Sequence, residues 1–105
     1  RPADVVRLHG CVDGINIKFT KCGGIREALR MMTLARGLGM QVMQGCFVST
    51  SLAIAPSLAI ATLADFNDLD GHLLLANDPC EGMLAHPGGI IELPDRPGLG
   101  VTPRA

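Results

Sequence analysis

The chain has 105 residues, of which 48% are hydrophobic, and its formal net charge is −1. Its Lys and Arg residues are scattered, and it has no Trp, no Tyr and three Phe, which argues against a nucleic-acid-binding surface. The longest apolar stretch, residues 51–63, is interrupted by Pro56 and serines and is shorter than the roughly 20 residues that cross a bilayer. We expect no signal peptide before Val5, because residues 1–4 lead directly into a short amphipathic segment. We therefore expect neither a nucleic-acid partner nor a membrane partner.

The chain alternates helix-like and strand-like segments up to about residue 75. In order, we expect a helix end over 2–10, a strand over 11–18, a helix from 23–24 to 37–39, a strand over 40–48, a helix over 52–64 and a strand over 66–75. Apolar residues recur at three- and four-residue spacing in the first long helix, whereas the strands are nearly continuous apolar runs. Ser49, Thr50 and Ser51 offer hydroxyl caps for the following helix, and Pro56 is expected near its first turn.

The order of these segments predicts an α/β fold with a parallel sheet and right-handed crossovers. A (β/α)₈ barrel of the TIM type repeats the same strand and helix unit, but it has eight strands and about 250 residues. The chain can supply only three of those strands, so we interpret residues 1–78 as the C-terminal segment of such a barrel. Residues 79–105 are then a C-terminal extension of the same protein, with one short strand over 89–93 and an extended tail over 94–103.

Four cysteines lie far apart in the sequence, at Cys11, Cys22, Cys46 and Cys80. They form no Cys-x-x-Cys pair and have no histidine at the spacing of a zinc site. We expect buried free thiols, which suits a reducing, cytoplasmic location. Cys46 has no histidine nearby in the sequence, so a nucleophilic role is not favoured.

Lys18 ends an apolar strand pattern and is followed by Lys21 and the pair Gly23-Gly24. In (β/α)₈ barrels the carboxyl ends of the strands and the loops after them carry the catalytic side chains. Lys18 is therefore a candidate base that takes a proton from carbon, and the charge of Lys21 could assist it. The alternative is two solvated loop lysines, because structural charges also imitate functional sites.

Asp68 and Asp70 are spaced so that both would lie on the same side of a strand. Two carboxylates so close repel each other unless a cation lies between them, and either a metal ion or a substrate ammonium group would serve. The alternative is a polar strand exit in which Asp70-Gly71 forms a turn. The neighbouring His72 is either a substrate contact or an ordinary exposed loop histidine.

Several of these motifs, in this order, resemble the last third of the barrels of the enolase superfamily, in the mandelate racemase and muconate lactonizing enzyme group. They are the segment Asn16-Ile17-Lys18-x-x-Lys21-x-Gly23-Gly24, the segment Asp68-Leu69-Asp70-Gly71 and the tail from Leu93 to Val101. The resemblance extends from Val12 to Val101, and the dipeptide epimerases of the L-Ala-D/L-Glu type are the most similar group.

The resemblance implies specific roles for four residues. In the dipeptide epimerases a lysine at the end of the sixth strand and another on the second strand move the α-proton on opposite faces of the substrate. Lys18 matches the sixth-strand lysine. Asp68 and Asp70 match a pair after the eighth strand that holds the amino group of the dipeptide, and Cys46 matches a pocket-lining position after the seventh. Ser49 stands where the family commonly has glutamate.

The resemblance also implies a cofactor, because superfamily members use Mg²⁺ in forming an ene-diolate. Its three carboxylate ligands follow the third, fourth and fifth strands, so we expect them in an N-terminal part outside these residues and assign no metal ligand here. Asp4 lies in the helix before the sixth strand and cannot replace them. The expected partners are a dipeptide, the N-terminal barrel and capping domain and, as an open alternative, further copies of the chain.

The leading hypothesis is thus a fragment of a Mg²⁺-dependent dipeptide epimerase, an isomerase that is inactive without the missing part. Muconate cycloisomerase, succinylbenzoate synthase and N-acylamino acid racemase activities would share Lys18 but not a pair such as Asp68 and Asp70 that holds an amino group. A third alternative is a non-catalytic half-barrel that serves binding or assembly. An open three-stranded sheet exposes its edges and an apolar face, so such a module would have to pair or aggregate.

Overall fold

The computed structural model describes every residue of the chain except Pro94. The chain divides into two compact units. The first unit comprises Arg1–Gly45 and Ala61–Asp68, and the second comprises Cys46–Ile60 and Leu69–Ala105. Both units are therefore built from two separate stretches of the sequence.

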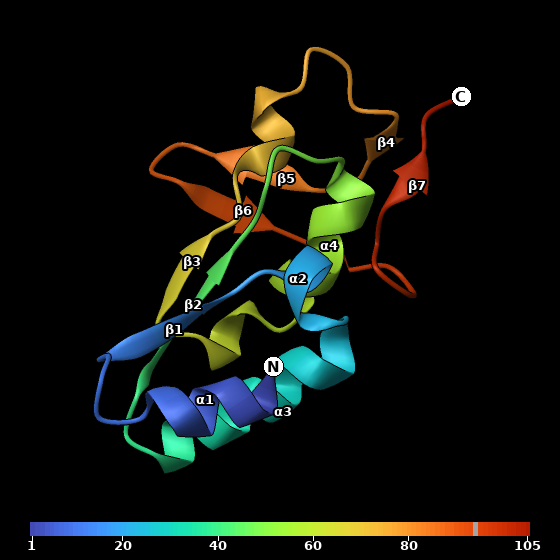
Figure 1. Ribbon diagram of the computed structural model, residues 1–105. Coiled ribbons are helices and arrows are strands. Elements are labelled where there is room, and N and C mark those ends of the chain that lie inside the picture. Colours follow the sequence, from blue (N-terminus) through green and yellow to red (C-terminus); the bar gives the residue numbers. More distant parts are fainter. Residues whose placement is uncertain (94) are drawn as a thin grey trace. The chain divides into compact units, whose positions relative to one another are not determined.

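The first unit contains most of the helical segments and the parallel strands (Figure 1). Its elements are α1 (Pro2–Leu8), β1 (Gly14–Ile17), α2 (Phe19–Cys22), α3 (Ile25–Gly37), β2 (Gln41–Gly45), the 3₁₀ helix η1 (Ala61–Leu63) and β3 (Phe66–Asp68). The second unit contains α4 (Ser51–Ala59), the 3₁₀ helix η2 (Gly71–Leu74), β4 (Cys80–Glu81), β5 (Leu84–His86), β6 (Ile90–Glu92) and β7 (Thr102–Pro103).

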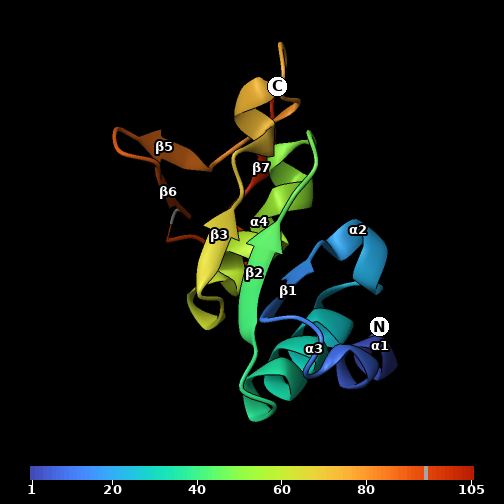
Figure 2. The same cartoon turned by 60° about the vertical axis from the view of Figure 1, so that its left-hand side comes forward.

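The three strands of the first unit form one parallel sheet in the order β1-β2-β3 (Figure 2). In its register Ile17 pairs with Gln44, and Gly45 pairs with Asp68. The predicted parallel sheet of three strands is therefore confirmed. The strands are shorter than the apolar runs that predicted them, because hydrophobicity continues into the loops after the paired residues end.

The third strand shows this difference most clearly. It was expected over residues 66–75, but β3 ends at Asp68. Asp70 has backbone angles of φ −84° and ψ −2° and is the N-cap of η2, so the chain has already left the extended conformation. The expectation that Asp68 and Asp70 share one side of a strand is consequently wrong, because alternation of side chains holds only within a strand.

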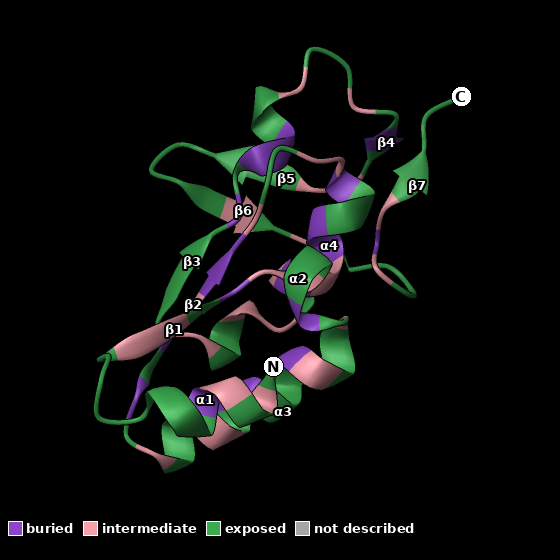
Figure 3. Ribbon diagram, in the orientation of Figure 1, coloured by how far each residue is buried: buried purple, intermediate pink, exposed green. Residues whose placement is uncertain are grey.

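The core of the first unit lies between the sheet and the helices α1 and α3. Ala28 and Met32 of α3, Val5 of α1, and Ile17 and Val42 of the strands are at most 2% exposed (Figure 3). Burying side chains of this kind is the main favourable contribution to folding. One face of the sheet thus packs against helices, whereas Asn16 and Asp68 lie exposed.

The helix α4 begins as the sequence predicts. Thr50 is its N-cap, and the hydroxyl oxygen of Thr50 accepts a hydrogen bond from the Ala53 N–H at 3.4 Å. The helix ends at Ala59 rather than at residue 64, and a separate 3₁₀ turn follows. Pro56 lies inside the helix rather than near its first turn, where a proline removes one backbone hydrogen bond.

The second unit has two small antiparallel sheets, β4 with β7 and β5 with β6. The strand expected over residues 89–93 is confirmed as β6. The other three strands were not predicted, because strands of two or three residues are too short to show a hydrophobic period. The expected tail over 94–103 therefore ends in β7, and its first residue, Pro94, lies outside the described residues.

All four cysteines are free thiols. Cys22 and Cys80 are buried and Cys46 is partly exposed, but Cys11 is exposed. The expectation that all four are buried is wrong for Cys11, because it lies in the turn that joins α1 to β1. Within the residues that the structure describes, no helix is both long enough and apolar enough to span a membrane.

Candidate active site

Lys18 lies directly after β1, at the carboxyl end of the strand, as the sequence predicts. Its backbone is still extended, with φ −121° and ψ 124°, and it is the N-cap of α2. The short helix α2 was not predicted, and it turns the chain away from the sheet so that Lys21 lies one turn after Lys18. Both lysines line one open cavity of about 340 Å³.

The register of the sheet places Lys18 on the same face as a second functional candidate, at the same level along the strands. Because Ile17 pairs with Gln44, Lys18 is level with Gly45, which pairs with Asp68. Side chains alternate along strands, so Lys18, Gly45 and Asp68 belong to one face of the sheet, opposite to that of Gln44. Two strand spacings put the Cα atoms of Lys18 and Asp68 ~10 Å apart. An amine and a carboxylate thus flank a glycine at the carboxyl edge.

There is very little room for a side chain at Gly45, because Asn16 and Lys18 lie close to it. A Cβ built on it would lie 2.8 Å from Oδ1 of Asn16, 3.1 Å from Nδ2 of Asn16 and 3.2 Å from Cε of Lys18. Asn16 and Gly45 were not predicted as site residues. The alternation of Asn16 with Lys18 and the presence of a glycine within a strand were the available signals, since such a glycine often marks a close approach.

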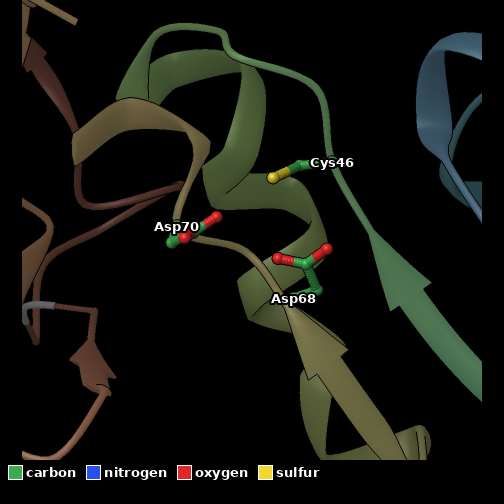
Figure 4. A group of neighbouring side chains, drawn as sticks. All are labelled: Cys46, Asp68 and Asp70. Atoms are coloured by element: carbon green, nitrogen blue, oxygen red, sulfur yellow. The ribbon is translucent and has the colours of Figure 1, made fainter. Parts of the chain in front are cut away.

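Asp70 and Cys46 both belong to the second unit. A carboxylate oxygen of Asp70 and the Sγ of Cys46 lie within 4.8 Å of each other. Next to them, a Cβ on Gly71 would lie 2.2 Å from the backbone oxygen of Phe47, so the two loops touch closely at this glycine. Figure 4 shows Cys46, Asp68 and Asp70, which follow or end the strands β2 and β3.

The donors at these strand ends do not suit Mg²⁺. They are the thiol of Cys46 and the carboxylates of Asp68 and Asp70. Mg²⁺ demands oxygen ligands in near-octahedral geometry, and thiolates favour softer metals. Both carboxylates are exposed. Carboxylates also accept charge-assisted hydrogen bonds from ammonium groups.

Two other aspartates have a structural role. Asp65 accepts a hydrogen bond from the Val42 N–H at 2.8 Å. Asp78 accepts hydrogen bonds from the N–H and hydroxyl of Ser51 and from the Cys80 N–H. Burial alone would raise the pKa of Asp78, but these hydrogen bonds outweigh it, so its pKa is lowered below the ordinary 3.8.

His72 is buried rather than exposed, with 7% of its surface accessible. Its two ring nitrogens have no hydrogen-bond partner among the described residues. It lines a cavity of about 550 Å³ together with Ser51, Asp78 and Arg104. The alternative of an ordinary exposed loop histidine is therefore wrong, and its contact with substrate stays a prediction.

Comparison with known proteins gives a consistent result. Residues 3–105 match the family described as "Enolase C-terminal domain-like". The chain is 50% identical over 101 residues to the L-Ala-D/L-Glu epimerase of Bacteroides thetaiotaomicron, covering 96% of this chain and 26% of the relative. It is 45% identical over 98 residues to the hydrophobic dipeptide epimerase of Roseobacter litoralis, covering 92% and 28%. The chain thus spans little more than a quarter of these relatives.

Solved structures of similar proteins share the fold. The dipeptide epimerase of Methylococcus capsulatus, complexed with Mg and the dipeptide L-Arg-D-Lys, superposes with a TM-score of 0.87 at 36% identity, covering 95% of this chain and 30% of that one. The substrate-liganded L-Ala-D/L-Glu epimerase of Bacillus subtilis gives 0.89 at 30% identity, covering 99% and 30%. The α/β fold with its parallel sheet matches the C-terminal barrel part of these enzymes, and the chain belongs to the enolase C-terminal domain-like family.

Proposed function

We propose that the protein to which these residues belong is a Mg²⁺-dependent dipeptide epimerase. The observation that carries this proposal is the placement of Lys18 and Asp68 on one face of the sheet, on either side of Gly45. The similarity to named dipeptide epimerases supports it. In this proposal β1, β2 and β3 are strands six to eight of the barrel, residues 1–78 complete the barrel, and residues 79–105 are its C-terminal extension.

Lys18 acts as a general base on the α-carbon next to the substrate carboxylate. Its amine takes the α-proton, and the electrons of the broken C–H bond move into the carboxylate to give an enolate. A second lysine, from the part of the barrel before this chain, returns a proton to the opposite face of the carbon and inverts it. Proton transfer by a positioned side chain contributes about 10²- to 10⁴-fold to a rate.

Asp68 and Asp70 bind the free amino group of the dipeptide, and Cys46 lines the pocket. An ammonium group between two carboxylates removes their mutual repulsion, so the pair favours a substrate with a free amino terminus. Bound Mg²⁺ would supply positive charge near the enolate, and its ligands are expected in the N-terminal part. The dipeptide, that part of the barrel and the capping domain are the partners that activity requires, so the 105 residues alone should be inactive.

A second candidate is an N-acylamino acid racemase. An N-acetyl-D-glutamate racemase from Pseudoalteromonas is 40% identical to this chain over 75 residues. An acylated amino group carries no charge, so it gains nothing from Asp68 and Asp70. Turnover of L-Ala-L-Glu against that of N-acetyl-L-glutamate therefore separates the two candidates.

The experiment follows α-proton exchange by ¹H NMR in D₂O with the complete polypeptide and Mg²⁺. We expect exchange and epimer formation with L-Ala-L-Glu. In Lys18→Met the rate of epimer formation should fall by at least about 10²-fold. Arg26→Met is the control, since Arg26 is exposed on α3 and its removal should leave the rate unchanged. Unchanged epimer formation in Lys18→Met would exclude Lys18 as one of the two bases, and a preference for N-acetyl-L-glutamate would favour the racemase.

A further inference from the structure

We propose that Gly45 and Asn16 are positioning residues for Lys18. This inference rests on the proposed role of Lys18 as a base. Its starting point is the space above Gly45, where a side chain would meet the Asn16 amide at 2.8 Å and Cε of Lys18 at 3.2 Å. Ordinary contacts between carbon atoms are about 3.5–4.0 Å, so even one methyl group does not fit there without a shift of these neighbours.

Space, rather than backbone conformation, explains the glycine. Gly45 is not among the residues with positive φ, so an alanine could adopt its backbone angles. A glycine within a strand weakens the strand and often marks a site of close approach. At Gly45 the approaching groups are the stem of Lys18 and the amide of Asn16, both from β1 and the residue after it.

Asn16 supplies the second boundary of this space. It lies two residues before Lys18 and therefore on the same face of the sheet. Both its Oδ1 and its Nδ2 lie within 3.1 Å of the missing Cβ position, close to the place reached by Cε of Lys18. The lysine stem thus crosses β2 over the glycine, with the asparagine amide beside it, which limits the directions in which the amine can point.

Restricting the amine matters because proton transfer depends strongly on distance. A displacement of about 1 Å can cost about 10²-fold in rate. In the complete polypeptide we therefore expect Gly45→Ala to lower kcat for L-Ala-L-Glu by about 10²-fold. We expect KM to change little, since Gly45→Ala leaves the carboxylates of Asp68 and Asp70 in place to bind the amino group.

Two other glycines provide matched controls. Gly37, at the end of α3, has no neighbour within 4 Å of the place where a Cβ atom would lie, so Gly37→Ala should leave kcat unchanged and should not lower stability. Gly14, at the other end of the sheet, would meet the backbone oxygen of Gln41 at 2.8 Å. Gly14→Ala should therefore lower the unfolding midpoint while the folded fraction keeps its kcat. Gly45→Ala should instead lower kcat and leave the unfolding midpoint nearly unchanged, because its neighbours are the ends of flexible side chains that can move.

A double variant tests the boundary formed by Asn16. Asn16→Ala alone should lower kcat by releasing the lysine stem, with KM again little changed. In Gly45→Ala combined with Asn16→Ala, the new methyl group takes the place of the lost amide. The double variant should therefore be more active than the product of the two single effects predicts, because residues in contact are not additive. Additive losses would show that Asn16 and a methyl group at position 45 do not restrict the Lys18 stem in the same space.

A chemical readout separates this inference from the proposed function. Lys18 and Lys21 are the only lysines of the chain, so an amine reagent followed by peptide mapping gives the labelling rate of Lys18 with Lys21 as internal reference. We expect Gly45→Ala to change this ratio severalfold and Gly37→Ala to leave it constant. An unchanged ratio with unchanged kcat would overturn the positioning role. A changed ratio together with full activity of Lys18→Met would keep the positioning role and remove the proposed function.

Discussion

The amino and carboxyl ends of the three-stranded sheet hold their aspartates in different surroundings. At the amino end, Asp65 accepts a hydrogen bond from the N–H of Val42, and Arg36 donates to the backbone oxygen of Leu63 and to Asp65. At the carboxyl end, Asp68 is exposed on the same face as the half-buried Lys18. The charged side chains at the amino end thus form hydrogen bonds with the backbone, whereas Asp68 at the carboxyl end is exposed.

The two ends of the sheet are expected to have different roles. In (β/α)₈ barrels, residues at the amino ends of the strands serve stability and those at the carboxyl ends serve catalysis. In the first unit the two ends differ in their contacts, with Asp65 hydrogen-bonded at the amino end and Asp68 exposed at the carboxyl end. We therefore expect substitutions at the amino end of the sheet to lower stability and substitutions at the carboxyl end to lower activity.

The largest effect is expected from Asp68→Asn combined with Asp70→Asn in the complete polypeptide. The substrate ammonium group loses two charge-assisted hydrogen bonds, each of which is worth about 1.5–3 kcal/mol. We expect kcat/KM for L-Ala-L-Glu to fall by about 10²-fold or more, with little change in urea stability because both side chains are exposed. Initial rates over a range of dipeptide concentrations measure this change.

N-acetyl-L-glutamate is the control substrate for this pair of substitutions. It has no ammonium group, so any slow turnover of it should not fall in the double variant. Unchanged turnover of the dipeptide would instead refute the assignment of Asp68 and Asp70, and would leave the polar strand exit as their explanation.

A smaller effect, on stability alone, is expected from Asp65→Ala. The N–H of Val42 and the guanidinium of Arg36 lose their shared carboxylate, and a donor left unsatisfied costs about 1–3 kcal/mol. Urea unfolding should show this loss. Asp13→Ala is the matched control, because Asp13 is exposed at the same end of the sheet. A fall in kcat of the folded protein would contradict the division between the two ends.

The sequence was sufficient to predict the parallel strands and the place of Lys18. Both depend on local patterns, since a run of apolar residues forms a buried strand and its last residue lies at the edge of the sheet. The ends of the strands were not predictable in the same way. Leu73 and Leu74 continue the apolar run after Asp68, and a prediction from hydrophobicity therefore extends the strand past Asp70. In the structure both leucines lie exposed in η2.

The closeness of Asn16, Gly45 and Lys18 was not predictable from spacing. Gly45 lies 27 positions after Lys18, and only the register between β1 and β2 brings them together. Register is set by which faces are buried and by the loops that join the strands. The hydrogen bonds of Asp78 are another case, because its donor Ser51 lies 27 positions earlier, and no local pattern joins a helix start to a distant carboxylate.

The smallest effect concerns Asp78, which resembles Asp65 in accepting hydrogen bonds from the backbone. Its pKa is lowered below the ordinary 3.8, so folding favours the ionised form. The stability that this carboxylate contributes is complete above about pH 4 and is lost as the pH falls through its lowered pKa. We expect the free energy of unfolding to decrease less between about pH 5 and pH 3 in Asp78→Asn than in the wild type. The difference should be under about 1 kcal/mol, because water screens a carboxylate near the surface. Asp13→Asn controls for the loss of one negative charge. Equal pH dependence of Asp78→Asn and the wild type would show that the ionisation of Asp78 does not stabilise the start of α4.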